Sequence, residues 1–200
     1  MTRMDRFEEF RRRLRPGKVY RRADLARWSN AVDRHIRQAV AAGVLAKVRG
    51  GLYYAPKRTV FGKAPAPDEA LVSGFLKGGD FLMTSPNAWN ALGVGVTQLH
   101  NRTVVYNHKR HEDVALGGRT FEFRRKAAFP KTATPEFLLV DLVNNVERTG
   151  EDPREVLDRV RARALAYDPA RLKRAVGKYG SERTKRIFAQ VLEARAAHAA

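Results

Sequence analysis

Amide and basic side chains gather in residues 30–38, in a pattern suited to hydrogen bonding with nucleic-acid bases. Asn30, Arg34, Arg37 and Gln38 fall within one predicted helix, residues 30–42, and share one side of it at about 100° per residue. An asparagine amide can pair with adenine, and an arginine can hold O6 and N7 of guanine. These four residues are therefore candidates for reading bases.

Groups able to hold phosphates flank this helix. Lys47 and Arg49 alternate with Ala46 and Val48, so the pattern predicts that both basic side chains share one face of a strand. The strand would bend back at Gly50-Gly51. The candidate contacts to the nucleic-acid backbone are Ser29, Lys47, Arg49, Arg21 and Arg22, and Arg11–Arg13 could add to them.

The elements that position these residues follow one another in a fixed order. A first helix over 3–14 ends at Pro16-Gly17, and a short extended piece follows. Ser29 is expected to end a second helix, 22–28, and to cap the third, which Gly43 closes. The apolar face of the third helix is formed by Val32, Ile36, Ala39 and Val40. This order, completed by the basic hairpin, predicts a winged helix–turn–helix over residues 1–56.

The charge of the chain favours a polyanionic partner. The formal net charge is +18, and residues 1–55 carry 14 Lys+Arg against 5 Asp+Glu, a net of +9. Residues 131–200 carry 14 against 10, so their charges are mixed in sign. Half of the excess therefore lies in the first quarter of the chain, where the candidate contacts also lie.

The cellular setting can be inferred from what the sequence lacks. There is no cysteine, which excludes disulfides and thiolate metal sites. No secretory signal or apolar run long enough to cross a bilayer is visible. We expect a cytoplasmic protein with no membrane partner.

Beyond residue 56 the chain changes character. Three prolines and a glycine in Pro56–Pro67 predict a linker at 57–67, followed by a second domain over 68–200. Gly117-Gly118 between strand-like segments predicts a hairpin. Helix-start signals recur at Thr134-Pro135, Asp152-Pro153 and Asp168-Pro169. The expected fold is α+β, with a mixed α/β segment and then a helical C-terminal part.

Two places raise the question of catalysis. His108, His111, Glu112 and Asp113 could bind a divalent metal for phosphodiester hydrolysis, although a solvated loop is expected between strands there. Asp141 lies in an apolar stretch, where we expect an exposed or hydrogen-bonded helix residue. No nucleophile–base pair or phosphate-binding glycine loop is visible. The sequence thus predicts no catalytic residue, no metal and no cofactor.

Several motifs follow one another along the chain: Val44–Ala55, Phe61-Gly62, Thr84–Gly93, Val104–Tyr106, Gly118–Phe123 and, more loosely, Tyr179-Gly180. In this order they resemble the AbiEi-like antitoxins of type IV toxin–antitoxin systems. The resemblance implies a winged N-terminal domain that represses its own operon at inverted repeats, with Asn30, Arg34, Arg37, Lys47 and Arg49 where that family reads DNA. It also implies that the rest of the chain counters a nucleotidyltransferase toxin.

Three functions remain open on the sequence. The first is a sequence-specific DNA-binding repressor, autoregulating as an antitoxin. The second is an RNA- or ribosome-associated protein that uses the same basic face. The third is a metal-dependent nuclease built on the cluster at 108–113.

Overall fold

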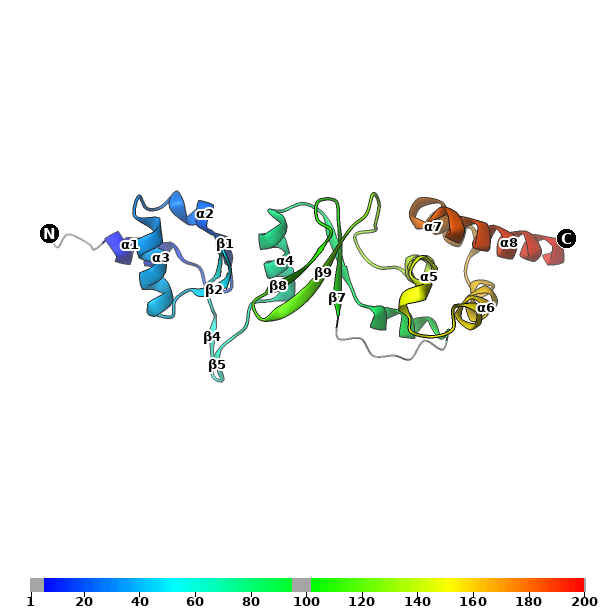
Figure 1. The fold of residues 1–200 in the computed structure, drawn as a ribbon, viewed down its shortest axis with the longest axis horizontal. Coiled ribbons are helices and arrows are strands. Elements are labelled where there is room, and N and C mark those ends of the chain that lie inside the picture. The colour runs from blue at the N-terminus through cyan, green and yellow to red at the C-terminus, as the bar shows by residue number, and fades with distance from the viewer. Residues whose placement is uncertain (1–5, 95–101, 200) are drawn as a thin grey trace. The chain divides into compact units, whose positions relative to one another are not determined.

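The computed structural model describes residues 6–94 and 102–199. It shows an α+β fold with a helical C-terminal part, as the sequence predicted (Figure 1). The chain divides into two compact units, one comprising the residues up to Gly79 with Asp113–Phe121, the other Asp80–Glu112 with Glu122 onward. This division differs from the boundary expected at 57–67, because a helix and part of a hairpin join the N-terminal elements.

The N-terminal elements follow the predicted order. Residues 3–5 of the first predicted helix lie outside the described residues, and the two other helices are shorter than predicted. The strands form an antiparallel sheet in the order β1-β3-β2. The elements are α1 (Arg6–Arg13), β1 (Val19–Arg21), α2 (Arg22–Ala26), α3 (Val32–Ala41), β2 (Ala46–Arg49) and β3 (Leu52–Tyr54).

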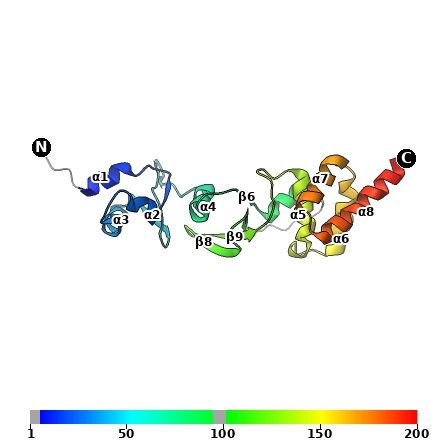
Figure 2. The ribbon, with the colours of Figure 1, turned by 90° about the horizontal axis from the view of Figure 1, so that it is seen from above.

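A small apolar core holds α3 in place. Val32, Ile36 and Ala39 recur at helical spacing and are buried, whereas Val40, expected beside them, is 38% exposed. Trp28, just after α2, meets the rings of Phe10 and Tyr20 edge-on. The buried residues of this core are Phe10, Tyr20, Leu25, Val32, Ile36, Ala39, Leu45 and Ala55. In both Figure 1 and Figure 2, α1, α2 and α3 lie together around it.

Strand β2 contains an irregularity that the alternation of its residues did not predict. Lys47 pairs with Tyr53, but Arg49 pairs with Leu52, because the register shifts between the two basic residues. Val48 is thus an extra residue, as in a β-bulge. Paired residues of adjacent strands place their side chains on the same face, so Lys47 and Arg49 lie on opposite faces.

The proline-containing stretch after β3 is ordered, and the prediction of a linker there was incomplete. It forms a short hairpin, β4 (Arg58–Thr59) with β5 (Gly62–Lys63), before α4 (Asp68–Leu76) begins. Helix α4 covers one face of the first sheet. Gly74 makes this possible, because a Cβ at that position would lie 2.6 Å from Cγ1 of Val19 and 3.3 Å from Cδ1 of Leu52.

A second sheet has the strand order β6-β7-β9-β8. Strands β6 and β7 are antiparallel neighbours, and β8 and β9 flank the predicted Gly117-Gly118 turn. Between β6 and β7 the chain also forms a 3-10 helix, η1. The elements are β6 (Phe81–Thr84), η1 (Pro86–Leu92), β7 (Thr103–Asn107), β8 (Glu112–Leu116) and β9 (Arg119–Arg125).

The C-terminal helices begin where the sequence signals predicted. The side chains of Thr134, Asp152 and Asp168 each accept a hydrogen bond from a backbone N–H in the first turn. The helices share a core with Trp89 and Leu92 of η1. Figure 2 shows these helices grouped near the C-terminus. They are α5 (Pro135–Asn144), η2 (Val146–Arg148), α6 (Pro153–Ala164), α7 (Pro169–Tyr179) and α8 (Glu182–Ala199). Among the described residues, no helix has the length and apolar character needed to cross a bilayer.

Candidate nucleic-acid interface

The four candidate base-reading residues lie on an accessible surface. Arg34, Arg37 and Gln38 are exposed on α3, on the side opposite the buried Val32, Ile36 and Ala39. Asn30 is exposed in the turn before the helix and lines the same hollow as Arg34. The Nε of Arg37 donates to the carbonyl of Asp33 at 3.4 Å, along its own helix. The structure therefore brings these residues to one side of α3.

Ser29 does not cap α3 as predicted. Ala31, not Ser29, is the N-cap residue of α3, and Ala31 makes no side-chain cap. The Ser29 hydroxyl accepts from the backbone N–H of Ala31 at 3.0 Å and lies 2.9 Å from Nδ1 of buried His35. The His35 ring in turn packs against Phe7 and Phe10. Ser29 thus holds the turn to the core, and it is half-buried rather than presented to a ligand.

An ion pair joins the two helices of the turn. Arg22 donates from Nε and a terminal nitrogen to the two carboxylate oxygens of Asp33, at 2.7 and 2.6 Å. This hydrogen bonding and the charge of Arg22 lower the pKa of Asp33. Bidentate pairing fixes orientation as well as distance. Arg22, predicted to contact phosphate, is therefore occupied with orienting α2 against α3.

A polar hollow opens at the N-terminal end of α3. Its volume is about 400 Å³, and three arginines line it with Asn30: Arg6 from α1, Arg27 after α2, and Arg34 from α3. The N-terminus of a helix favours anions, because its free N–H groups and dipole point outward. Arg6 and Arg27 were not among the predicted site residues. Only the packing of α1 and α2 near the start of α3 brings them to this end.

The shift in β2 separates the two predicted wing residues. Lys47 shares a sheet face with Tyr20 and Tyr53, both in contact with the core under α3. Arg49 faces α4, where its guanidinium lies 5.4 Å from the centre of the Phe75 ring. The prediction that Lys47 and Arg49 share one face of the strand was wrong, because Val48 is an extra residue between them.

Arg21 is likewise turned to α4. Its Nε donates to the carbonyl of Gly74 at 3.1 Å. Since Arg21 pairs with Leu52 in the sheet, it lies on the face of Arg49 rather than that of Lys47. Of the five predicted contacts to the nucleic-acid backbone, only Lys47 lies on the expected face of the sheet with an exposed side chain. Lys47 makes no ion pair with a described residue.

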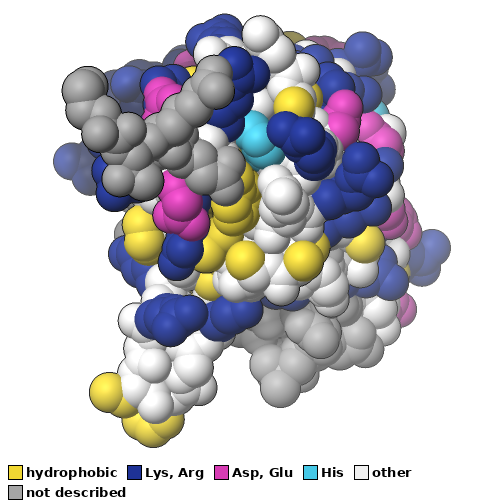
Figure 3. Space-filling view, turned by 90° about the vertical axis from the view of Figure 1, so that its left-hand side faces the viewer, with side chains coloured by type: hydrophobic (Ala, Val, Ile, Leu, Met, Phe, Trp, Pro, Cys, Tyr) yellow, Lys and Arg dark blue, Asp and Glu magenta, His cyan; other side chains and the backbone are white. Residues whose placement is uncertain are grey.

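The positive charge of this region is not neutralised by its own carboxylates. Each of the four in residues 6–55 is already engaged: Glu8 with Arg11, Glu9 with Arg13, Asp33 with Arg22, and Asp24 with the backbone N–H of Arg21. Figure 3 shows Lys and Arg side chains spread over this end of the first unit, with few acidic ones between them. The surface is thus suited to a polyanion.

The histidine-containing cluster of the second sheet forms no metal site in the described part of the chain. His108 lies 2.9 Å from the carbonyl of Lys126 and stacks on Phe129, while Glu112 pairs with Arg110. Within residues 6–94 and 102–199, no group of three or more His, Cys, Asp or Glu is placed to hold a metal ion.

Asp141 is hydrogen-bonded, one of the two expected states, and is buried rather than exposed. Its carboxylate accepts from Tyr106 at 2.7 Å, Asn145 at 3.1 Å and Trp89 at 3.3 Å. Burial raises the pKa of Asp141, and burial together with the nearby carboxylate raises that of Tyr106. The network ties α5 to η1 and β7, and each of its polar contacts is internal, which is typical of a structural carboxylate.

Comparison with known proteins yields a likeness of fold. No family model matches the chain, and no curated protein matches it. A solved structure described as the RV2827C protein from Mycobacterium tuberculosis is similar, with a TM-score of 0.56 at 14% sequence identity. The match covers 94% of this chain and 74% of that one. At this identity the likeness concerns the fold alone.

Proposed function

We propose that residues 6–55 act as a winged helix–turn–helix that binds double-stranded DNA, and that the protein is a sequence-specific transcriptional repressor. The observation that carries this proposal is the exposed polar side of α3, with Arg34, Arg37 and Gln38 displayed on a helix whose other side is anchored in a core. In this class of domain such a helix enters the major groove.

We assign the roles to a narrower set of residues than the sequence alone suggested. Asn30, Arg34, Arg37 and Gln38 are the proposed base-reading set. Arg6 and Arg27, at the hollow beside the start of α3, and Lys47, on the α3 side of the sheet, are the proposed phosphate contacts. Arg21 and Arg49 leave that set because both are engaged with α4.

The first test is a binding titration. The probe is a short duplex that the full chain selects from a random-sequence library, and its affinity is measured by fluorescence anisotropy at several salt concentrations. If about five phosphates are neutralised, log K falls against log salt with a slope of about −4.5. A flat response overturns the proposal. Tighter binding to a structured RNA in competition would support an RNA-associated role instead.

The second test separates base reading from charge. Arg34→Ala is expected to cost about 1–3 kcal/mol on the selected duplex and to broaden the sequences recovered on reselection. Arg27→Ala, which removes the same charge from the rim of the same hollow, is expected to weaken selected and random duplexes alike. A uniform loss in both variants would show that α3 does not read bases.

We further propose that this repressor is the autoregulating antitoxin of a two-gene system. The support is the ordered set of motifs that resembles AbiEi-like antitoxins, and a second unit whose C-terminal helices have their own core. The test is co-expression with a nucleotidyltransferase encoded beside its gene: growth arrest relieved by the full chain supports the proposal. No relief, or a neighbouring gene of another kind, contradicts it while leaving DNA binding intact.

A further inference from the structure

The β4–β5 hairpin carries the most exposed large hydrophobic side chains of the described residues. Val60 is 93% exposed and Phe61 98% exposed, and they form the two-residue tip between paired Thr59 and Gly62. Figure 3 shows a protrusion at its lower left that ends in hydrophobic side chains, with Lys and Arg side chains nearer its base. Water around an exposed phenyl ring is unfavourable, so the tip is better suited to a partner than to solvent.

The tip is also held in one shape by local bonds. The Thr59 hydroxyl donates to the carbonyl of Gly62 at 3.0 Å and accepts from the backbone N–H of Phe61 at 3.3 Å. Gly62 has a φ of +105°, which other residues rarely adopt. Tight turns ordinarily use Gly, Asn, Asp or Pro at their central positions. Val60 and Phe61 are therefore not explained by the needs of the turn.

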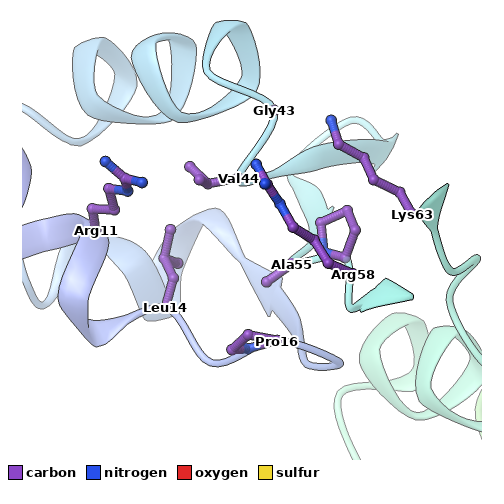
Figure 4. Close-up of a pocket in the computed structure, with 9 residues that line it drawn as sticks. Arg11, Leu14, Pro16, Gly43, Val44, Ala55, Arg58 and Lys63 are labelled. Atoms are coloured by element: carbon purple, nitrogen blue, oxygen red, sulfur yellow. The ribbon is translucent and has the colours of Figure 1, made fainter. Parts of the chain in front are cut away.

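The charges around the tip indicate what kind of partner it meets. Residues 56–67 contain Lys57, Arg58 and Lys63 and no acidic residue. Arg58 and Lys63, together with Arg11 of α1, line a cavity of about 330 Å³ beside Gly43 and Val44, where α3 has just ended (Figure 4). An apolar tip on a purely cationic base complements a polyanion that also offers apolar surface, which is the character of a DNA groove with stacked bases.

We propose that this hairpin is a second DNA-contacting element, which enters the minor groove next to the major-groove site of α3 and wedges Phe61 between two base pairs. Arg58 and Lys63 then contact the phosphates bordering that groove. Apolar wedges of this kind partly unstack a base step and bend the duplex toward the major groove by about 20–90°. The inference rests on the DNA binding proposed above, and adds to it that the bound DNA is kinked.

The experiment measures bending of the selected duplex by the full chain. The site is placed at different positions in longer fragments, and gel mobility reports the angle and position of the bend; permanganate reactivity of thymines reports unstacking. We expect the wild-type protein to bend the site and Phe61→Ala to abolish both signals, with affinity lowered about tenfold from lost stacking. Phe61→Leu keeps an apolar wedge and is expected to retain most of the bend.

Two controls separate the tip from general effects. Leu165→Ala removes a half-exposed hydrophobic side chain from the second unit and is expected to leave the bend unchanged. The double variant Arg58→Ala with Lys63→Ala is expected to flatten the salt slope by about 1–2. Because residues 60 and 61 make no contribution to a buried core, circular dichroism of the Phe61 variants is expected to match wild type.

The outcomes distinguish the two proposals. If the wild-type chain shows no salt-dependent binding to duplex DNA, the proposed function fails and this inference fails with it. If it binds but leaves the DNA straight, or if Phe61→Ala bends the DNA as well as wild type, only this inference is overturned. In that case the exposed tip serves a protein partner, while α3 remains a DNA-binding helix.

Discussion

Lys47 and Arg49 carry the same charge two positions apart, yet their surroundings give them different tasks. We expect Lys47→Ala to flatten the salt slope of duplex binding by about 1, because Lys47 lies on the α3 side of the sheet. Arg49→Ala removes the same charge and is expected to leave the slope unchanged, because Arg49 stacks on Phe75. Its effect should appear instead in urea unfolding, as a loss of about 0.5–1 kcal/mol of cation–π energy.

Each variant serves as the control for the other, since strand, charge and replacement are matched. If Lys47→Ala and Arg49→Ala flatten the salt slope equally, the face of the sheet on which a cation lies does not determine whether it contacts DNA. An unchanged slope in Lys47→Ala would remove the sheet from the interface altogether.

Asp141 gives the protein a pH-dependent stability of unusual sign for a carboxylate. Its pKa is raised above the ordinary 3.8, mainly by burial, so the folded state holds this proton more tightly than the unfolded chain does. The contribution of the group is therefore full below the unfolded-state pKa and is lost as pH rises through the folded-state pKa. We expect the unfolding free energy of wild type, relative to Asp141→Asn, to decrease as pH increases.

Urea unfolding between about pH 4 and pH 8 measures this difference. Asp158→Asn, which removes an exposed carboxylate on α6, controls for the general effect of one lost negative charge. A wild-type advantage over Asp141→Asn that grows with pH would show that the carboxylate is stabilised in its charged form. The Tyr106, Trp89 and Asn145 donors would then outweigh burial.

At the scale of elements, the approach of α4 to the first sheet depends on one missing side chain. Gly74→Ala should gain about 1 kcal/mol in helix propensity. It should lose about 1–3 kcal/mol through overpacking, because the new Cβ would lie 2.6 Å from Cγ1 of Val19. We therefore expect a net loss of stability in thermal or urea unfolding.

Gly177→Ala is the matched control for this substitution. Gly177 lies within α7 and has open space where a Cβ would be, so the same change should stabilise by about 0.5–1 kcal/mol. Val19→Ala combined with Gly74→Ala should recover part of the loss, since it removes the methyl that the new Cβ meets. If Gly74→Ala is as favourable as Gly177→Ala, α4 does not pack tightly on the sheet.

The sequence predicted elements whose signals are local. Thr134-Pro135, Asp152-Pro153 and Asp168-Pro169 each begin a helix as expected, because a cap and a fixed proline φ act within one turn. The exposed side of α3 followed from helical periodicity for the same reason. Local signals were misleading at Pro56–Pro67, where the prolines suggested a linker but Arg58–Thr59 and Gly62–Lys63 pair as a hairpin.

Features that depend on distant partners could not be predicted in this way. Asp141 receives its hydrogen bonds from Trp89 and Tyr106, 52 and 35 residues earlier in the chain. Arg6 and Arg27 reach the start of α3 only through the packing of α1 and α2. The register shift in β2 is set by pairing with β3, and nothing in Ala46–Arg49 alone distinguishes it from a regular strand.

At the scale of the whole molecule, each unit has its own core and one tryptophan. Trp28 packs on the core under α3, and Trp89 is buried in the core of the C-terminal helices. Protein labelled with 5-fluorotryptophan should therefore show two ¹⁹F resonances, one from each unit. We expect them to report separate midpoints in urea, because the two clusters share no residue.

The selected duplex should shift only one of these transitions. At a free concentration of about 100 Kd, a ligand that binds the folded state alone adds about 2.7 kcal/mol. We expect that increment at Trp28 and none at Trp89, and a random duplex at the same concentration is the control. Equal shifts at both resonances would mean that the units unfold together, and a shift at Trp89 alone would place the nucleic-acid site in the second unit.

The extra residue in β2 has a consequence for how such a surface can change during evolution. Substitutions along a regular strand alter what a position offers but leave the direction in which it points. Removal of Val48 would make the strand regular, but Lys47 and Arg49 would then be adjacent and would still lie on opposite faces, with Arg49 on the side of Leu52 and Phe75. Loss of the extra residue would therefore leave the two cations on their separate faces, and only a change in the register of β2 against β3 would bring Arg49 to the side of Lys47.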